Sequence, residues 1–143
     1  MMQETYYTWK EFDQDILLLV SQMQGWMPDY VVGIKRGGLI PAIKLSHILD
    51  KPLLILSCQL RDGKDNCIKF LEEIPKDKKL LIVDDICDSG ETFERINQEL
   101  KDYKEIKFCA LFNNIRQKFL TDYKAKKIDR EENKKWIIFP WEL

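Results

Sequence analysis

Four short and almost entirely apolar runs recur along this chain, and segments with the apolar spacing of helices separate them. The runs cover residues 30–34, 53–56, 80–83 and 106–112. A strand that is apolar throughout, instead of alternating with polar residues, is typical of a sheet that is covered on both faces. The pattern therefore predicts an α/β fold, with a mostly parallel, twisted sheet flanked by helices. Ligands of such sheets bind where strand ends meet loops.

Three helices are predicted between these strands. Thr8 and Glu11 have the spacing of a capping box, and the apolar residues that follow them predict a helix over residues 9–24. The helical spacing returns over residues 39–49, where a proline in the first turn costs no hydrogen bond. The third helix is marked by apolar residues from Phe93 to Tyr103. The only histidine, His47, lies in the second helix, and we expect it to have a packing or surface role.

Three other segments are less regular. Residues 59–66 are polar and predict a mobile loop, and residues 67–70 predict a short edge strand. Arg61 and Lys64 lie in this loop, which is expected to close over a site. Residues 113–143 are charged and weakly periodic up to a tryptophan-rich stretch, and we expect them to fold over the end of the sheet as a small C-terminal hood.

Composition and charge exclude several classes of protein. The 143 residues suit one domain, and the balance of 45% hydrophobic and 33% charged residues is that of a globular chain. A net charge of −1 argues against nucleic acid or an anionic membrane as partner, and no apolar run approaches the ~20 residues that span a bilayer. The four cysteines lack metal-ligand spacing, and we expect reduced thiols in a cytoplasmic protein. They are Cys58, Cys67, Cys87 and Cys109.

The third apolar run is joined to the third helix by an acidic pair and a turn. Ser89, Gly90 and Thr92 place backbone amides and hydroxyl groups at a helix N-terminus, which suits a phosphate group. Asp84 and Asp85 point in different directions, so together they can hold a sugar diol and a hard cation. These residue types favour a phosphorylated, metal-bound ribose as ligand. The alternative interpretation is a solvated acidic turn that caps a helix.

These residues resemble the signature of the type I phosphoribosyltransferases, most closely that of the 6-oxopurine enzymes, which act on xanthine, guanine or hypoxanthine. The resemblance implies transfer of the 5-phosphoribosyl group from phosphoribosyl pyrophosphate (PRPP) to a purine base, with release of pyrophosphate. It implies that Asp84 and Asp85 bind the ribose and that Asp85 also binds Mg²⁺. Asp88 would contact N7 of the purine as catalytic acid or base. The residues implied for the 5′-phosphate are Asp88, Ser89, Gly90, Glu91 and Thr92.

A second part of the resemblance lies in the turn after the first apolar run. The residues similar to the pyrophosphate loop of the xanthine-guanine enzymes are Lys35, Arg36, Gly37 and Gly38. Unpaired amides around the two glycines, beside cationic Arg36, would stabilise the charge on departing pyrophosphate. The resemblance also implies a cis peptide bond between Lys35 and Arg36. Taken alone, two adjacent glycines are more often only a turn.

The third part lies near the C-terminus, where residues 136–142 resemble the base-binding segment of the xanthine-guanine enzymes and of short archaeal relatives. The resemblance assigns Trp136 to stacking on the base and the carbonyl group of Ile137 to reading its edge. It also makes residues 113–143 the base-binding hood of a single phosphoribosyltransferase domain, residues 1–143. The alternative is that these tryptophans belong to the core or to a dimer interface.

The resemblance fails at one position. Where the 6-oxopurine enzymes use a lysine to grip O6 of the purine, this chain has Asn113 and Asn114, and an asparagine offers a hydrogen bond but no charge. Asn114 is the candidate base-binding residue here, and the identity of the base stays open. One alternative is a non-catalytic sensor of PRPP or nucleotides on the same fold. Another is an enzyme that uses a different acceptor or hydrolyses PRPP. The resemblance further implies Mg²⁺ as cofactor and a homodimer or homotetramer in purine salvage.

Overall fold

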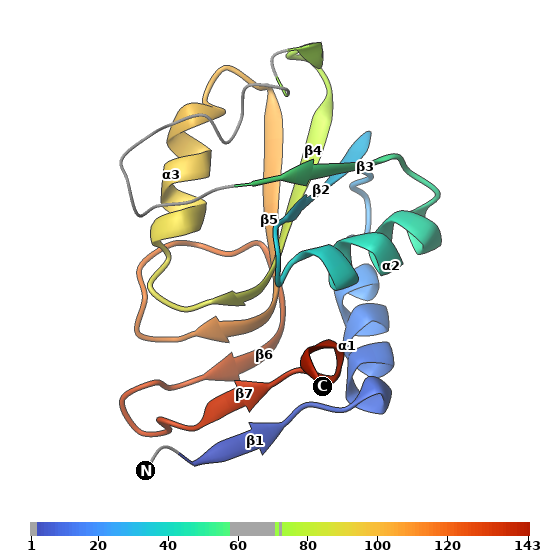
Figure 1. Ribbon diagram of the computed structural model, residues 1–143. Coiled ribbons are helices and arrows are strands. Elements are labelled where there is room, and N and C mark those ends of the chain that lie inside the picture. The colour runs from blue at the N-terminus through green and yellow to red at the C-terminus, as the bar shows by residue number, and fades with distance from the viewer. Residues whose placement is uncertain (1–2, 58–70, 72) are drawn as a thin grey trace.

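The computed structural model describes residues 3–57, 71 and 73–143, and its centre is a five-stranded sheet (Figure 1). The strand order is β3-β2-β4-β5-β6, and all four pairings are parallel. The strands are β2 (Tyr30–Ile34), β3 (Leu53–Leu56), β4 (Lys79–Cys87), β5 (Glu105–Asn114) and β6 (Tyr123–Ile128). The predicted α/β fold with a parallel sheet is confirmed.

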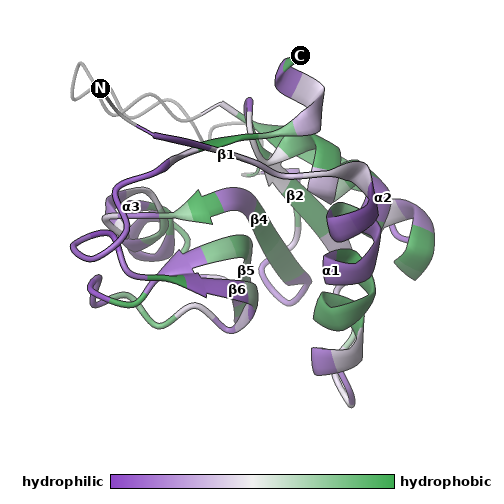
Figure 2. Ribbon diagram, turned by 90° about the horizontal axis from the view of Figure 1, so that it is seen from below, coloured by the Kyte–Doolittle hydropathy of each residue, from purple (hydrophilic) through white to green (hydrophobic). Residues whose placement is uncertain are grey.

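Helices cover both faces of this sheet, as its apolar strands predict (Figure 1). They are α1 (Trp9–Gln22), α2 (Leu39–Leu49) and α3 (Glu91–Glu99). Along β4, Leu81 and Val83 join the core under α1 and α2, whereas Leu80 and Ile82 join the core under α3. Successive side chains of β4 thus pack on opposite faces of the sheet. Figure 2 shows the hydrophobic stretches of β2 and β4 between the helices.

The helix boundaries follow local signals. The capping box is confirmed, since Glu11 N donates to Thr8 Oγ1 at 3.1 Å and Thr8 N donates to Glu11 Oε2 at 2.9 Å. Helix α2 has the predicted bounds. Helix α3 begins and ends earlier than residues 93–103, because Gly90 takes a left-handed conformation and starts the helix before its first apolar residue.

Three strands, β1, β6 and β7, were not predicted. Strand β1 (Glu4–Tyr6) pairs in parallel with β7 (Trp136–Ile138) as a second, two-stranded sheet, and the 3-10 helix η3 (Pro140–Glu142) follows. Strand β6 lies at the sheet edge and carries three lysines, a composition that protects edges but hides the strand pattern. The segment expected to cap the sheet from residue 113 therefore first contributes the end of β5 and all of β6.

A buried carboxylate links α1 to the segment after β1 and to β6. Asp15 accepts a hydrogen bond from the Tyr7 hydroxyl at 2.7 Å, and Lys126 Nζ lies 2.9 Å from Asp15 Oδ2. A buried carboxyl group is costly unless it is paired and hydrogen-bonded, and these two contacts meet that need for Asp15. The network fixes the terminal segments relative to the central sheet.

Several predictions fall outside the described residues. They concern the loop 59–66 with Arg61 and Lys64, the edge strand 67–70, and the cysteines Cys58 and Cys67. Of the other cysteines, Cys87 and Cys109 are buried free thiols. His47 is exposed on α2, in agreement with a surface role. Among the described residues, no helix combines the length and apolar character that a bilayer-spanning segment needs.

Candidate active site

Two loops meet at the carboxyl ends of β2 and β4. These strands are neighbours, but the chain leaves β2 toward β3 on one side and leaves β4 toward β5 on the other. Such a reversal opens a crevice beyond the strand ends, where ligands bind in open α/β sheets. The loop of residues 35–38 follows β2, the segment of residues 84–92 ends β4 and leads into α3, and the two segments lie close together at Gly37, Gly38 and Asp85. The sequence assigned both segments to PRPP, and the structure brings them together.

The two glycines of the first loop lie directly against β4. A Cβ atom on Gly37 would lie 2.2 Å from Oδ2 of Asp85, and one on Gly38 would lie 2.4 Å from the carbonyl oxygen of Val83. Both gaps are far below van der Waals contact, and at Gly38 the clashing atoms are backbone, so only glycine permits the approach there. The loop backbone and the acid pair therefore face the same small space.

The backbone of this loop agrees with the prediction in one respect and differs in another. The peptide bond between Lys35 and Arg36 is cis, as expected, and both side chains are exposed. The Gly38 amide, however, donates to the carbonyl oxygen of Ile34 at 2.9 Å. The expectation of unpaired amides at both glycines is wrong for Gly38, because that amide closes the turn back onto the last residue of β2.

The acid pair at the end of β4 is held by the backbone that follows it. Asp85 N donates to Asp84 Oδ1 at 2.8 Å, and Ile86 N donates to Asp85 Oδ1 at 2.7 Å. Burial, and next the negative charge of Asp85, raise the pKa of Asp84 well above its usual range. Two crowded carboxylates of this kind favour a ligand that brings positive charge or hydroxyl donors.

The donor set fits a magnesium ion that is shared with a substrate. Asp84 and Asp85 offer hard oxygen ligands, and no group of three or more His, Cys, Asp or Glu side chains able to hold a metal occurs among the described residues. Mg²⁺ typically binds through one or two carboxylates, with waters and substrate phosphates completing its shell. The carboxylates present suit that mode of binding rather than a cage made of protein alone.

We expect Asp84→Asn to raise the Tm of the ligand-free protein by about 2–4 °C at pH 8, the shift that ~1 kcal/mol produces in a domain of this size. Since the pKa of Asp84 is raised in the folded state, that state holds the proton more tightly than the unfolded chain does. Stability is therefore lost as the pH rises from the unfolded value, about 3.9, through the folded value. Asparagine does not ionise, so the variant should not lose stability in this way as the pH rises.

Thermal unfolding of the wild type and the variant at pH 4 and pH 8 tests the prediction. The difference in Tm should be small at pH 4 and larger at pH 8. Asp102→Asn, which replaces an exposed carboxylate far along the chain, is the control and should show no such pH dependence. A lower Tm for Asp84→Asn at pH 8 would contradict the expected cost of ionising Asp84.

The turn between β4 and α3 forms the next part of the site. Gly90 has a φ of 84° and precedes the first residue of α3, while Glu91 N donates to Ser89 Oγ at 3.2 Å. The free amides of the first helical turn point out of this end of the helix, where anions are stabilised. A cavity of about 110 Å³ opens here, lined by Asp84, Ile86, Cys87, Asp88, Ser89, Gly90, Thr92 and Phe93.

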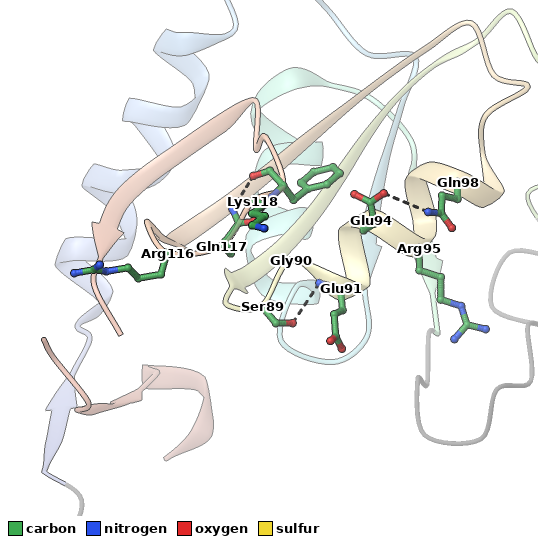
Figure 3. Close-up of a pocket in the computed structure, with 10 residues that line it drawn as sticks. Ser89, Gly90, Glu91, Glu94, Arg95, Gln98, Arg116, Gln117 and Lys118 are labelled. Carbon is green, nitrogen blue, oxygen red and sulfur yellow. Dashed lines mark hydrogen bonds between the residues drawn. The ribbon is translucent and has the colours of Figure 1, made fainter. Parts of the chain in front are cut away.

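A wider cavity of about 430 Å³ lies on the outer side of the same turn (Figure 3). Ser89 and Gly90 line it together with residues of α3 and of the segment 116–119. Its wall is close to the turn, since a Cβ atom on Gly90 would lie 2.6 Å from Oε1 of Gln117. The wider cavity is lined by none of Asp84, Asp85 and Asp88, whereas the smaller one is lined by Asp84 and Asp88.

Asp88 follows the acid pair and is held by the end of β5. The side-chain amide of Asn114 donates to the Asp88 carbonyl oxygen at 3.1 Å and to Asp88 Oδ1 at 3.3 Å. The Asp88 side chain is 58% exposed, whereas Asn114 is buried. Asn114 thus orients a carboxylate that stays largely exposed to solvent, as an accessible proton acceptor must be.

Arg130, which the sequence did not indicate, connects Asp88 to the C-terminal segment that carries Trp136 and Ile137. Trp136 is 54% exposed at the start of β7, and Ile137 is buried beside it. Arg130 Nη1 donates to the Lys135 carbonyl oxygen at 2.7 Å, while its Nε lies 3.6 Å from Asp88 Oδ1. Arg130 lies in the charged segment of residues 113–143 that was expected to form the hood, and no motif in the sequence distinguished it.

A parallel sheet whose loops carry a phosphate-type turn, an acid pair and a glycine loop defines the class of transferases that bind a phosphorylated, activated ribose. The chain belongs to the family described as phosphoribosyl transferase domain, which it matches over residues 3–143. The resemblance seen in the sequence, the fold and the enzyme class are thereby confirmed.

Individual relatives agree with this assignment. The xanthine-guanine phosphoribosyltransferase of Cereibacter sphaeroides is 26% identical, with 96% of this chain and 86% of the relative aligned. That of Gluconobacter oxydans is 28% identical, with 94% and 82% aligned. The crystal structure of a purine phosphoribosyltransferase from Pyrococcus horikoshii is 37% identical and superposes with a TM-score of 0.79, covering 98% of this chain and 94% of that one.

Proposed function

We propose that this phosphoribosyltransferase joins the 5-phosphoribosyl group of PRPP to a 6-oxopurine, namely guanine, xanthine or hypoxanthine, and releases pyrophosphate. The observation that carries the proposal is the exposed carboxylate of Asp88, oriented by Asn114 beside the acid pair. The names of the xanthine-guanine and purine relatives support the same class of base.

In this proposal, PRPP spans the crevice between the two loops. Its ribose hydroxyls donate to Asp84 and Asp85. Asp85 would also hold Mg²⁺, which would supply positive charge that stabilises the pyrophosphate as it leaves. The 5′-phosphate is bound by the turn of residues 88–92, through the amides and hydroxyls at the N-terminus of α3. The pyrophosphate is bound by Lys35, Arg36, Gly37 and Gly38.

The proposed reaction needs no covalent enzyme intermediate. The bond between C1 of the ribose and the pyrophosphate oxygen breaks, and the electron pair leaves with pyrophosphate. N9 of the base donates its lone pair to C1, and the proton on N7 passes to Asp88. Alignment of the reactants and stabilisation of charge at both ends supply the acceleration. Asp88 is the catalytic residue because it contacts the reacting base.

The base-binding part of the proposal rests on the C-terminal segment. Trp136 stacks on the base and the carbonyl group of Ile137 reads its edge, so the β1–β7 pair and η3 form the hood of a single domain. The exposed apolar side chains of Trp9, Leu17 and Ile43 on α1 and α2 support a homodimer or homotetramer. The proposed setting is purine salvage in the cytoplasm.

A panel of bases tests the function. The protein is mixed with PRPP, Mg²⁺ and guanine, xanthine, hypoxanthine or adenine in turn, and nucleotide is detected by mass. We expect product with one or more 6-oxopurines and at least about 100-fold less with adenine, because a site built for hydrogen bonds rejects analogues that cannot make them. Product from adenine alone would overturn the base class. Nucleotide binding without turnover would favour a sensor, and pyrophosphate release without a base would indicate hydrolysis.

A further inference from the structure

Arg130 brings a cation to the base end of the site. Its Nε is the one buried side-chain nitrogen or oxygen without a hydrogen-bond partner in the part of the chain that the structure describes. It lies 3.6 Å from Oδ1 of Asp88, beyond hydrogen-bond distance, although the side chain is only 21% exposed. A buried donor without a partner is costly, so its retention here calls for a ligand that accepts from it.

Asn114 cannot supply this donor to a base. An asparagine side chain has two amide hydrogens and an oxygen with two lone pairs. Both hydrogens are used by Asp88, and the oxygen accepts from Arg116 N at 3.2 Å and from Arg130 N at 3.3 Å. With its capacity filled, Asn114 positions Asp88 and the Arg130 backbone instead of contacting a base.

The position of Arg130 is fixed from both sides of the proposed base site. Its backbone amide is tied to Asn114 at the end of β5, and its Nη1 is tied to Lys135, the residue before Trp136. The guanidinium group therefore lies between the carboxylate proposed to contact N7 and the strand proposed to hold the ring. A flexible surface arginine would have no such double attachment.

A 6-oxopurine presents the acceptor O6 next to N7, and with N7 held by Asp88 a guanidinium donor beside that carboxylate can donate to O6. Adenine carries a donor amino group in place of O6, so its amino group would face the guanidinium donor of Arg130 and no hydrogen bond could form. We infer that Arg130 reads the 6-oxo group of the base. This inference deepens the proposed function and rests on it for the location of the base.

The test compares two nucleotides on the intact chain by calorimetry, so that it does not depend on turnover. Inosine 5′-monophosphate carries the 6-oxo group, and purine riboside 5′-monophosphate lacks it together with the N1 hydrogen. The wild type, Arg130→Met and Arg130→Lys are titrated with both. Lys134→Met is the matched control, since it removes an exposed cation from the same segment.

We expect the wild type to prefer inosine monophosphate, and Arg130→Met to lose about 10- to 100-fold of that preference, the effect of one hydrogen bond to a charged group. Arg130→Lys should keep part of the preference, and Lys134→Met all of it. The ratio of affinities is insensitive to the fraction of protein that folds.

An unchanged ratio in Arg130→Met would overturn the inference, even if both affinities fell together, because a merely structural arginine behaves in that way. A wild type with no preference, or with no affinity for either nucleotide, would overturn it as well. If the ratio falls in Arg130→Met but no base yields product, the proposed function fails while the role of Arg130 in reading the ring stands.

Discussion

Replacing Asp88 by asparagine should lower kcat by about 10²–10⁴-fold, the contribution of a positioned acid or base, while PRPP affinity stays within about twofold. Asparagine can still accept hydrogen bonds from the Asn114 amide, so the turn should keep its shape. It cannot take the proton that leaves N7. Steady-state kinetics with the best base of the panel gives kcat, and calorimetry with PRPP and Mg²⁺ gives the affinity.

Asp13→Asn is the control for this experiment, because it removes an exposed carboxylate on α1 and should leave kcat unchanged. The pH profile of kcat provides a second readout. If Asp88 carries the proton, the limb of the profile that belongs to this carboxyl group should disappear in Asp88→Asn. Full activity in the variant, with an unchanged profile, would remove Asp88 from the mechanism.

Gly38→Ala should both destabilise the fold and abolish productive binding of PRPP. The added Cβ would lie 2.4 Å from the Val83 carbonyl oxygen, 2.8 Å from that of Ile34 and 3.0 Å from Asp84 Cα. All three are backbone atoms, so no side chain can rotate away and the loop must lift from β4. We expect a loss of about 3 kcal/mol, near the upper end for overpacking, and at least a tenfold loss of PRPP affinity.

Gly25→Ala separates these two effects. Gly25 has a φ of 80° but no atom within 4 Å of the position of an added Cβ. Alanine at this position should lower the free energy of unfolding by roughly 1–2 kcal/mol, because of the left-handed conformation and not because of a clash. Denaturant unfolding and PRPP calorimetry on both variants should therefore show two destabilised proteins, of which only Gly38→Ala has lost affinity. Normal PRPP affinity in Gly38→Ala would show that the contact between the loop and β4 is dispensable.

The central fold was predictable where local sequence and burial agree. Residues 30–34 and 53–56 became strands with the predicted bounds. The β-branched residues of 30–34 are buried inside the parallel sheet, and the apolar run 53–56 pairs beside them. The capping box set the start of α1 for a similarly local reason. By contrast, β6 gave little signal, since an edge strand is solvated along one side and tolerates lysines.

The site was predictable only in parts that lie close together in the chain. The acid pair, the turn of Ser89 and Gly90, and the start of α3 form one continuous segment, and its residue types suggested a phosphate and a ribose. The alternation of a strand was enough to place Asp84 and Asp85 on different sides. The assignment to Asn114 was incomplete, because its saturation by Asp88 and by two backbone amides is visible only in three dimensions.

The sequence by itself determined the parallel sheet, the phosphate-type turn and the family, because these depend on side-chain periodicity and on residues within one or two turns of each other. Only the tertiary structure decided that Gly37 and Gly38 lie on the acid pair, that β1 joins β7, and that Arg130 reaches Asp88. Such contacts follow from the order and register of the strands, which depend on the packing free energy of the whole chain rather than on any local pattern.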